Sequence, residues 1–199
     1  MDGGEGDDVM RNHLTVALAA LVSTAAVAAP AIAGPLEEGL AAHERFDFAT
    51  ALTVLEPLAE QGNVEAQLRL GLIYHKGLGV RRDSAKAMKW LRLAADQDNA
   101  QAQYVLGTIY WWKNDYAETF KLYLRSAQHG YGYAQDYLGD MYAQGFGVPV
   151  DNVQAYFWHD RAAAQGVQNA AEKRDLIAKK LTPDEIAQAQ KLAQEWKPK

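Results

Sequence analysis

The chain has 199 residues, of which 49% are hydrophobic and 23% charged, and its formal net charge is −5. This composition excludes a disordered chain. The first 33 residues hold four acidic side chains and one basic one, so residues 34–199 hold 21 acidic and 19 basic side chains, which leaves no electrostatic footprint for nucleic acid or an anionic membrane. There is no cysteine, which excludes disulfides, thiol nucleophiles and cysteine-ligated metals.

An uncharged segment runs from Leu14 to Pro35 and contains Ala31-Ile32-Ala33. Small residues at the first and third of these positions are typical of a signal-peptidase site. The sequence therefore predicts a signal peptide at 1–33, cleaved after Ala33, and a periplasmic or secreted protein with no membrane segment after cleavage. The acidic prefix is unusual for such signals, which makes Met10 a candidate start. An uncleaved anchor helix is the alternative.

The rest of the chain repeats with steps of 32 or 36 residues. Equivalent alanines lie at positions 66, 102, 134 and 170. A period of this length, with apolar residues at helical spacing, indicates helix-turn-helix units that stack on one another. The sequence therefore predicts about four units, at 34–65, 66–101, 102–133 and 134–169, and a C-terminal helical cap at 170–199.

Three residue types recur inside these units, and each is expected to be structural. Glycines in the first helices would allow close approach of the second helices, and these are Gly39, Gly71, Gly107 and Gly139. The small residues expected opposite them are Ala51, Ala87 and Ala155. Tyrosines follow three residues after the glycines, at Tyr74, Tyr110 and Tyr142. Aspartates expected to cap the second helices are Asp47, Asp83, Asp115 and Asp151.

The pattern A…LG.IY..G.GV..D..KA..W...AA, which begins at Ala66 and recurs from Ala134, resembles the Sel-1-like repeat, a branch of the tetratricopeptide repeat superfamily. The resemblance covers 34–169, although the first and third units lack four loop residues. It implies an all-α, right-handed α/α superhelical solenoid with a concave groove. It also implies protein binding, and seldom catalysis.

The C-terminal segment KKLTPDEIAQAQKLAQEW reads as a capping helix. Thr182 is the expected N-cap, Pro183 occupies the first helical position, and Glu185 completes a capping box. A terminal repeat needs a polar outer face, which this segment supplies. Trp90 and Trp158, which share a position with Leu122, are expected in the core or in a seam between units.

No catalytic motif is present, and none of the five histidines lies three or four residues from another. His43 and His75 occupy equivalent positions, so a metal site between neighbouring units is conceivable, but surface histidines are the simpler interpretation. The sequence therefore predicts a protein that is not an enzyme and has no cofactor or metal.

The variable positions of the first helices predict a protein-binding groove. Its expected residues are Tyr104, Thr108, Trp111, Trp112, Tyr133, Tyr137 and Asp140. Either tryptophan could instead fill a seam beside the glycine-rich loop of a neighbouring unit. The predicted partner is a protein or peptide, and the predicted role is an adaptor or regulator of an envelope protein or signalling system. The alternatives are a cell-wall glycan binder, a β-lactam- or peptidoglycan-directed hydrolase, and weak self-association.

Overall fold

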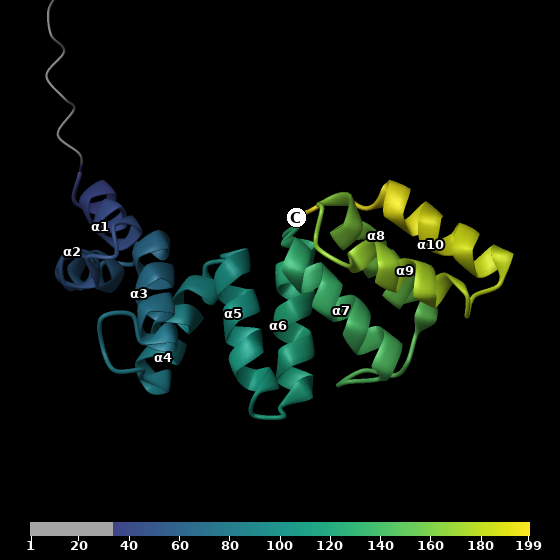
Figure 1. Cartoon of the computed structure of the whole chain (residues 1–199), viewed down its shortest axis with the longest axis horizontal. Coiled ribbons are helices and arrows are strands. Elements are labelled where there is room, and N and C mark those ends of the chain that lie inside the picture. The colour runs from purple at the N-terminus through teal and green to yellow at the C-terminus, as the bar shows by residue number, and fades with distance from the viewer. Residues whose placement is uncertain (1–33) are drawn as a thin grey trace, which may run out of the picture. The chain divides into compact units, whose positions relative to one another are not determined.

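The computed structural model describes residues 34–199, so the predicted signal peptide lies outside the described residues. The described part folds into ten α-helices and no strand (Figure 1). From α1 to α9, each helix packs against the next one along the chain. This arrangement confirms the predicted all-α helical solenoid. The helices are α1 (Pro35–Glu44), α2 (Phe48–Glu60), α3 (Val64–Lys76), α4 (Ser84–Asp96), α5 (Ala100–Trp111), α6 (Tyr116–Gln128), α7 (Gly132–Gln144), α8 (Asn152–Ala164), α9 (Ala170–Ala178) and α10 (Pro183–Glu195).

Aspartate side chains begin the second helix of every predicted unit. The Oδ1 atom of Asp83 accepts hydrogen bonds from the amides of Ala85 and Lys86 at 3.0 and 2.9 Å. Single bonds of the same kind, at 3.2, 3.1 and 3.0 Å, are accepted by Asp47, Asp115 and Asp151. An N-cap contributes about 1 kcal/mol. The recurrence of aspartate therefore has the structural reason that the sequence predicts.

The recurrent glycines lie beneath large side chains of the second helices. The pairs are Gly39 with Leu55, Gly71 with Leu91, Gly107 with Tyr123 and Gly139 with His159. A Cβ atom at Gly71 would lie only 2.6 Å from Cγ of Leu91, so the close approach is present. The atoms nearest to the missing Cβ belong to these bulky side chains. The expected small residues Ala51, Ala87 and Ala155 lie one turn earlier on the second helices and are fully buried, and Thr119 at the equivalent position donates to the Gly107 carbonyl at 3.3 Å.

Tryptophan or leucine fills one recurrent core position of the second helices. Trp90, Leu122 and Trp158 are 3%, 5% and 5% exposed. The predicted core placement of both tryptophans is therefore confirmed.

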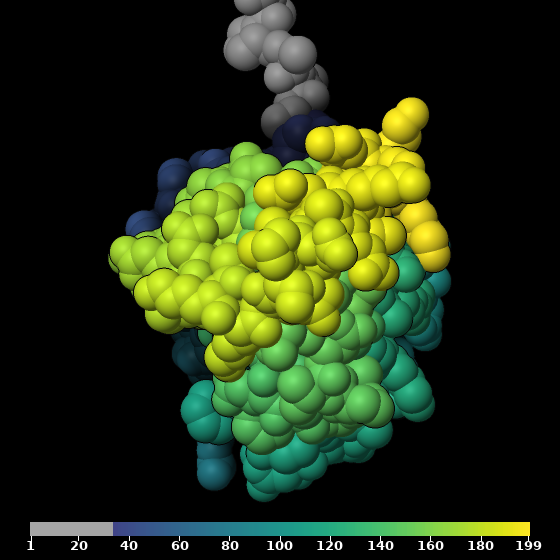
Figure 2. All heavy atoms as spheres, turned by 90° about the vertical axis from the view of Figure 1, so that its right-hand side faces the viewer, coloured from purple at the N-terminus to yellow at the C-terminus, as the bar shows by residue number. Residues whose placement is uncertain are grey.

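The C-terminal helix α10 packs against α8 rather than α9 (Figure 1). Figure 2 shows the last residues of the chain, in yellow, on this end of the molecule. The predicted capping box is present, since Thr182 accepts a hydrogen bond from the amide of Glu185 and the Glu185 carboxylate accepts one from the amide of Thr182. Ala189 and Ala193 are buried on the inner side of α10. The terminus therefore closes the end of the stack.

A buried glutamine follows the repeat alanines at 66, 102 and 134 and joins consecutive units. The Nε2 atoms of Gln67, Gln103 and Gln135 donate to the carbonyls of Ala59, Ala95 and Ala127 at 3.0, 3.1 and 3.1 Å. We call the surroundings of these bonds the first junction (the α2–α3 turn with α4), the second junction (the α4–α5 turn with α6) and the third junction (the α6–α7 turn with α8). The repeating sequence thus builds three equivalent sites.

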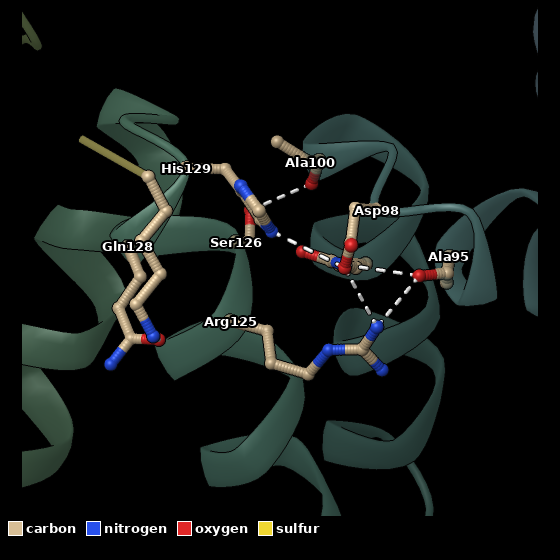
Figure 3. Close-up of polar contacts among 9 residues, drawn as sticks. Ala95, Asp98, Ala100, Arg125, Ser126, Gln128 and His129 are labelled. Atoms are coloured by element: carbon tan, nitrogen blue, oxygen red, sulfur yellow. Dashed lines mark hydrogen bonds and ion pairs between the residues drawn. The ribbon is translucent and has the colours of Figure 1, made fainter.

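Charged side chains close the second junction (Figure 3). Arg125 donates to the Ala95 carbonyl and to the Asp98 carboxylate at 3.0 and 3.1 Å, and Nε2 of His129 lies 3.3 Å from Asp98. The hydrogen bond from Arg125 is the largest cause of the lowered pKa of Asp98. Asp98 has a φ of 61°, a conformation that glycine occupies at the other two junctions, as Gly62 and Gly130.

Candidate protein-binding surface

Four tyrosines from α5, α7 and the turn before α7 lie together. The ring centroid of Tyr104 is 5.2 Å from that of Tyr131, 6.3 Å from that of Tyr133 and 5.9 Å from that of Tyr137. Tyr133 and Tyr137 are 56% and 42% exposed. We call these four residues the tyrosine surface. It contains three of the seven residues that the sequence predicts for a groove.

A buried tyrosine supports this surface from below. Tyr123 is 1% exposed and stacks on Tyr104, with 5.5 Å between the ring centroids. Its hydroxyl shares a 3.1 Å hydrogen bond with Thr108, another predicted groove residue. Burial raises the pKa of Tyr123 to about 12 and also raises the pKa of Tyr104 and Tyr131. The phenols of Tyr104 and Tyr131 are therefore neutral at pH 7, and each supplies an aromatic ring and a hydroxyl that can form hydrogen bonds.

The surface is built at a local cost. Asn63 and Asn99 cap α3 and α5 by accepting hydrogen bonds from the third helical amides. At the equivalent position of α7 stands Tyr131, which makes no side-chain cap. Losing such a cap costs about 1 kcal/mol. A residue that departs from a repeated structural pattern is often functional. Here tyrosine in place of asparagine at position 131 gives up the helix cap and adds an aromatic ring to the tyrosine surface.

The two adjacent tryptophans of α5 differ in their surroundings. The ring of Trp111 lies 5.0 Å from that of Tyr116 and 5.1 Å from that of Phe146, both in edge-on geometry. Phe146 belongs to the glycine-rich loop of the next unit, so Trp111 fills a seam. Trp112 is 76% exposed. The structure thus places Trp111 apart from the tyrosine surface, and ligand binding by Trp112 stays a prediction.

Asp140, the remaining predicted groove residue, belongs to a polar cluster that the sequence analysis missed. Lys173 of α9 donates to Asp136 and to Asp140 at 2.7 Å each. The Nδ1 atom of His159 lies 3.0 Å from Asp136, and its Nε2 atom lies 3.6 Å from Asp140. Tyr104 lies three residues before its repeat glycine, Gly107. The residue three before Gly139 is Asp136, so Asp136 rather than Tyr137 is the equivalent of Tyr104. His159 replaces the apolar or aromatic residue of other units, which is the sequence signal for this cluster.

Opposing effects set the charges of the cluster. Burial raises the pKa of Asp136, but hydrogen bonds from His159 and Lys173 outweigh burial and leave it below its usual value. Burial lowers the pKa of Lys173, and its bonds to Asp136 and Asp140 outweigh that effect and raise it. Both groups are therefore charged at pH 7. The Lys173 ammonium also lies 5.9 Å from the ring centroid of Tyr137, which ties the cluster to the tyrosine surface.

The stability of this cluster should depend on pH below about pH 4. Because the pKa of Asp136 is lower in the folded state, its contribution is present above the unfolded-state pKa and is lost as pH falls through the folded-state pKa. We expect urea unfolding between about pH 7 and about pH 3 to show a steeper loss of unfolding free energy for the wild type than for Asp136→Asn. Parallel curves would contradict this assignment.

Among residues 34–199, no group of three or more metal-ligating side chains is placed to hold an ion. In the same range no helix is long and apolar enough to cross a membrane. The carboxylates of Asp136 and Asp140 are bound to Lys173, so they are already engaged. The stacked helices and the exposed tyrosines together define a helical-repeat scaffold.

Comparison with known proteins identifies the family. The Sel1 repeat matches residues 64–99, 100–131 and 132–167, which is just over half of the chain. The chain belongs to the Sel1 repeat family. Residues 34–63 are outside the matched ranges. Their repeat glycine, Gly39, and their capping aspartate, Asp47, nevertheless make the same contacts as the equivalent residues of the other units. A search of curated proteins found no match.

A solved structure of the same family shares this architecture. The crystal structure of a Sel1 repeat protein from Oxalobacter formigenes has 36% identity and a TM-score of 0.58, and covers 62% of this chain and 96% of that one. The crystal structure of c5321, a protective antigen present in uropathogenic Escherichia coli strains that displays an SLR fold, has 24% identity, a TM-score of 0.40 and coverage of 79% and 52%. This chain thus spans about half of that protein. Sel1 repeat proteins generally mediate protein–protein interactions and are generally not catalytic.

Proposed function

We propose that this chain is an exported, non-catalytic adaptor that binds an extended or helical segment of an envelope protein over its tyrosine surface. The observation that carries the proposal is the gathering of Tyr104, Tyr131, Tyr133 and Tyr137, two of which are largely exposed. Exposed aromatic rings held by a packed base are the commonest anchors of protein interfaces. Export to the periplasm is supported by the uncharged stretch and by Ala31-Ile32-Ala33.

The surroundings of the tyrosine surface suit a peptide backbone. Neutral phenol hydroxyls can donate to carbonyls or accept from amides of an extended segment. Asp140 and Lys173 add a polar edge, and their mutual ion pair leaves little net charge there. Affinity would therefore come mainly from ring contact and hydrogen bonds, with a weak dependence on salt.

The test is a crosslinking pull-down from an envelope extract of the source organism, with residues 34–199 as bait. We expect Tyr133→Ser/Tyr137→Ser to lose its partner, because two hot-spot rings are worth about 2 kcal/mol each, or roughly thirtyfold per ring. The captured protein is then purified, and its affinity for each variant is measured.

Phe46→Ser is the matched control, because Phe46 is 78% exposed and lies in the α1–α2 turn. It should bind like the wild type. Trp112→Ser tests separately whether the exposed tryptophan contributes to partner binding. Equal capture by the wild type and the double variant would contradict the proposal. Retention on peptidoglycan that is lost in the double variant would favour the glycan-binding alternative instead.

A further inference from the structure

The three junctions are built alike and closed differently. Each junction has an alanine whose carbonyl accepts a hydrogen bond from the buried glutamine. Each also has a turn residue with a positive φ and a large core residue from the second helix. The left-handed residues are Gly62, Asp98 and Gly130, and the core residues are Trp90, Leu122 and Trp158. The second junction is closed by Arg125 and His129 (Figure 3). A comparison of the other two shows what the first junction can bind.

The third junction is closed by the chain's own C-terminus. The ring of Trp196 lies edge-on to that of Trp158, with 6.2 Å between centroids. The backbone amide of Lys199 donates to the Gln128 carbonyl at 2.9 Å, and its ammonium donates to the Gln128 side chain at 2.8 Å. Pro198 lies over Gly130, with its Cβ 3.4 Å from the place where a Gly130 side chain would begin. An extended segment of aromatic, any residue, proline and lysine thus fits a junction of this type.

The first junction has the same receptor residues, and Gln97 donates there to Gln67 at 2.8 Å as Gln165 does to Gln135 at 2.7 Å in the third. No segment of the described chain lies over the first junction in the way that residues 196–199 lie over the third. A hollow of about 460 Å³ opens there, and its lining includes Glu60, Gly62, Trp90 and Leu93. No atom lies within 4 Å of the place where a Gly62 side chain would stand. Leu93 is 41% exposed, whereas its equivalents Arg125 and Arg161 are both engaged in ion pairs.

The hollow is lined by one acidic side chain, Glu60, and one basic one, Lys89, and Glu60 favours a basic residue at its end of the occupant. The residue equivalent to Gln128 is Glu60, an exposed carboxylate that makes no ion pair within 34–199. An ammonium that binds an amide oxygen at the third junction would bind a carboxylate at the first, and charged partners strengthen a hydrogen bond. Lys89 covers the Trp90 ring at 4.3 Å, and its flexible side chain can move aside for an incoming aromatic ring.

We propose that the first junction binds an extended segment of a partner protein in which an aromatic residue is followed, after one residue, by proline and then by lysine or arginine. The chain's own terminus is not the occupant, because it is held at the third junction by an intramolecular contact of high effective concentration. This site lies on the α2–α3 turn and α4, whereas the tyrosine surface lies on α5 and α7. The proposal is therefore independent of the function proposed above.

The probe is a labelled peptide that copies residues 194–199, titrated into ¹⁵N-labelled protein of residues 34–199. We expect amide shifts in the α2–α3 turn and in the second half of α4. Glu60→Lys should weaken binding at least about tenfold through loss of a charged pair. A peptide with its last lysine changed to glutamate should restore binding to Glu60→Lys and bind the wild type poorly.

Glu56→Lys is the matched control, because Glu56 is an exposed acid one turn earlier on α2 and the charge change is identical. It should bind like the wild type. Leu93→Arg introduces at the first junction an arginine equivalent to Arg125, which closes the second junction. This variant should therefore also fail to bind the peptide. The proposal is overturned if the peptide binds nowhere, if Glu60→Lys and the wild type bind alike, or if the shifts map to Trp158 and Gln128 and sedimentation shows tail exchange between copies.

Discussion

Asp136→Ala is expected to lower the free energy of unfolding by about 3–5 kcal/mol, because it leaves the buried His159 donor without its acceptor and removes one of the two partners of the Lys173 ammonium. His159 is 1% exposed, and Asp136 accepts from its Nδ1 atom at 3.0 Å and from Lys173 at 2.7 Å. The imidazole cannot turn toward solvent, since it is packed on the backbone at Gly139. Urea unfolding at neutral pH measures the loss.

Two further variants separate the ion cluster from general packing. Asp140→Ala should cost less, because the Asp140 side chain is 27% exposed and water can replace it beside Lys173. Asp136→Ala/His159→Leu should recover much of the lost stability, since leucine stands at the equivalent positions 55 and 91 and leaves no buried donor. A cost below about 1 kcal/mol for Asp136→Ala would show that the cluster does not hold this unit together.

Features that recur in every unit were predictable, because each repeat faces the same packing problem. Asp83 and its equivalents cap helices wherever a second helix starts, and Gly71 and its equivalents make room wherever two helices meet. A repeated residue in one sequence carries much of the information that an alignment would give. The helical solenoid followed from those repeats.

Features that occur once were not predictable in the same way. Asp136 and His159 depart from the repeat, and their partner Lys173 comes from α9, beyond the last unit. The sequence shows that a polar residue occupies a core position, but it does not show which distant side chain forms a hydrogen bond with that residue. Trp111 and Trp112 are neighbours of the same type, yet only Trp111 lies against Phe146, because adjacent residues of a helix point about 100° apart.

The alternation of short and long loops has a physical reason in these contacts. In each short-loop unit an aromatic residue opens the second helix, Phe48 in the first unit and Tyr116 in the third. The second glycine of the following long loop lies directly on it, Gly79 on Phe48 and Gly147 on Tyr116. Trp111 and Phe146 then fill the space around the second of these contacts. Trp111, which stands where the long-loop units have His75 and Ala143, is thus part of a two-unit packing pattern.

Gly147→Ala should therefore cost about 3 kcal/mol of unfolding free energy, from two sources. Gly147 has a φ of 70°, and an L residue in that conformation costs roughly 1–2 kcal/mol. A Cβ atom there would also overlap the carbonyl oxygen of Tyr116, a backbone atom that cannot turn away, and such overpacking adds roughly 1–3 kcal/mol. Urea unfolding gives the total.

Gly166→Ala isolates the first source, the conformational cost, because Gly166 has a φ of 74° and nothing within 4 Å of a Cβ atom. It should cost only the conformational part, so the difference between the two variants measures the contact between the long loop and the short-loop unit. Equal costs would show that the loop moves away freely from Tyr116. A larger cost at Gly147 would instead mean that this backbone contact holds Phe146 and Trp111 in place. The loop that carries Phe146 can approach the Tyr116 backbone this closely only because residue 147 has no side chain.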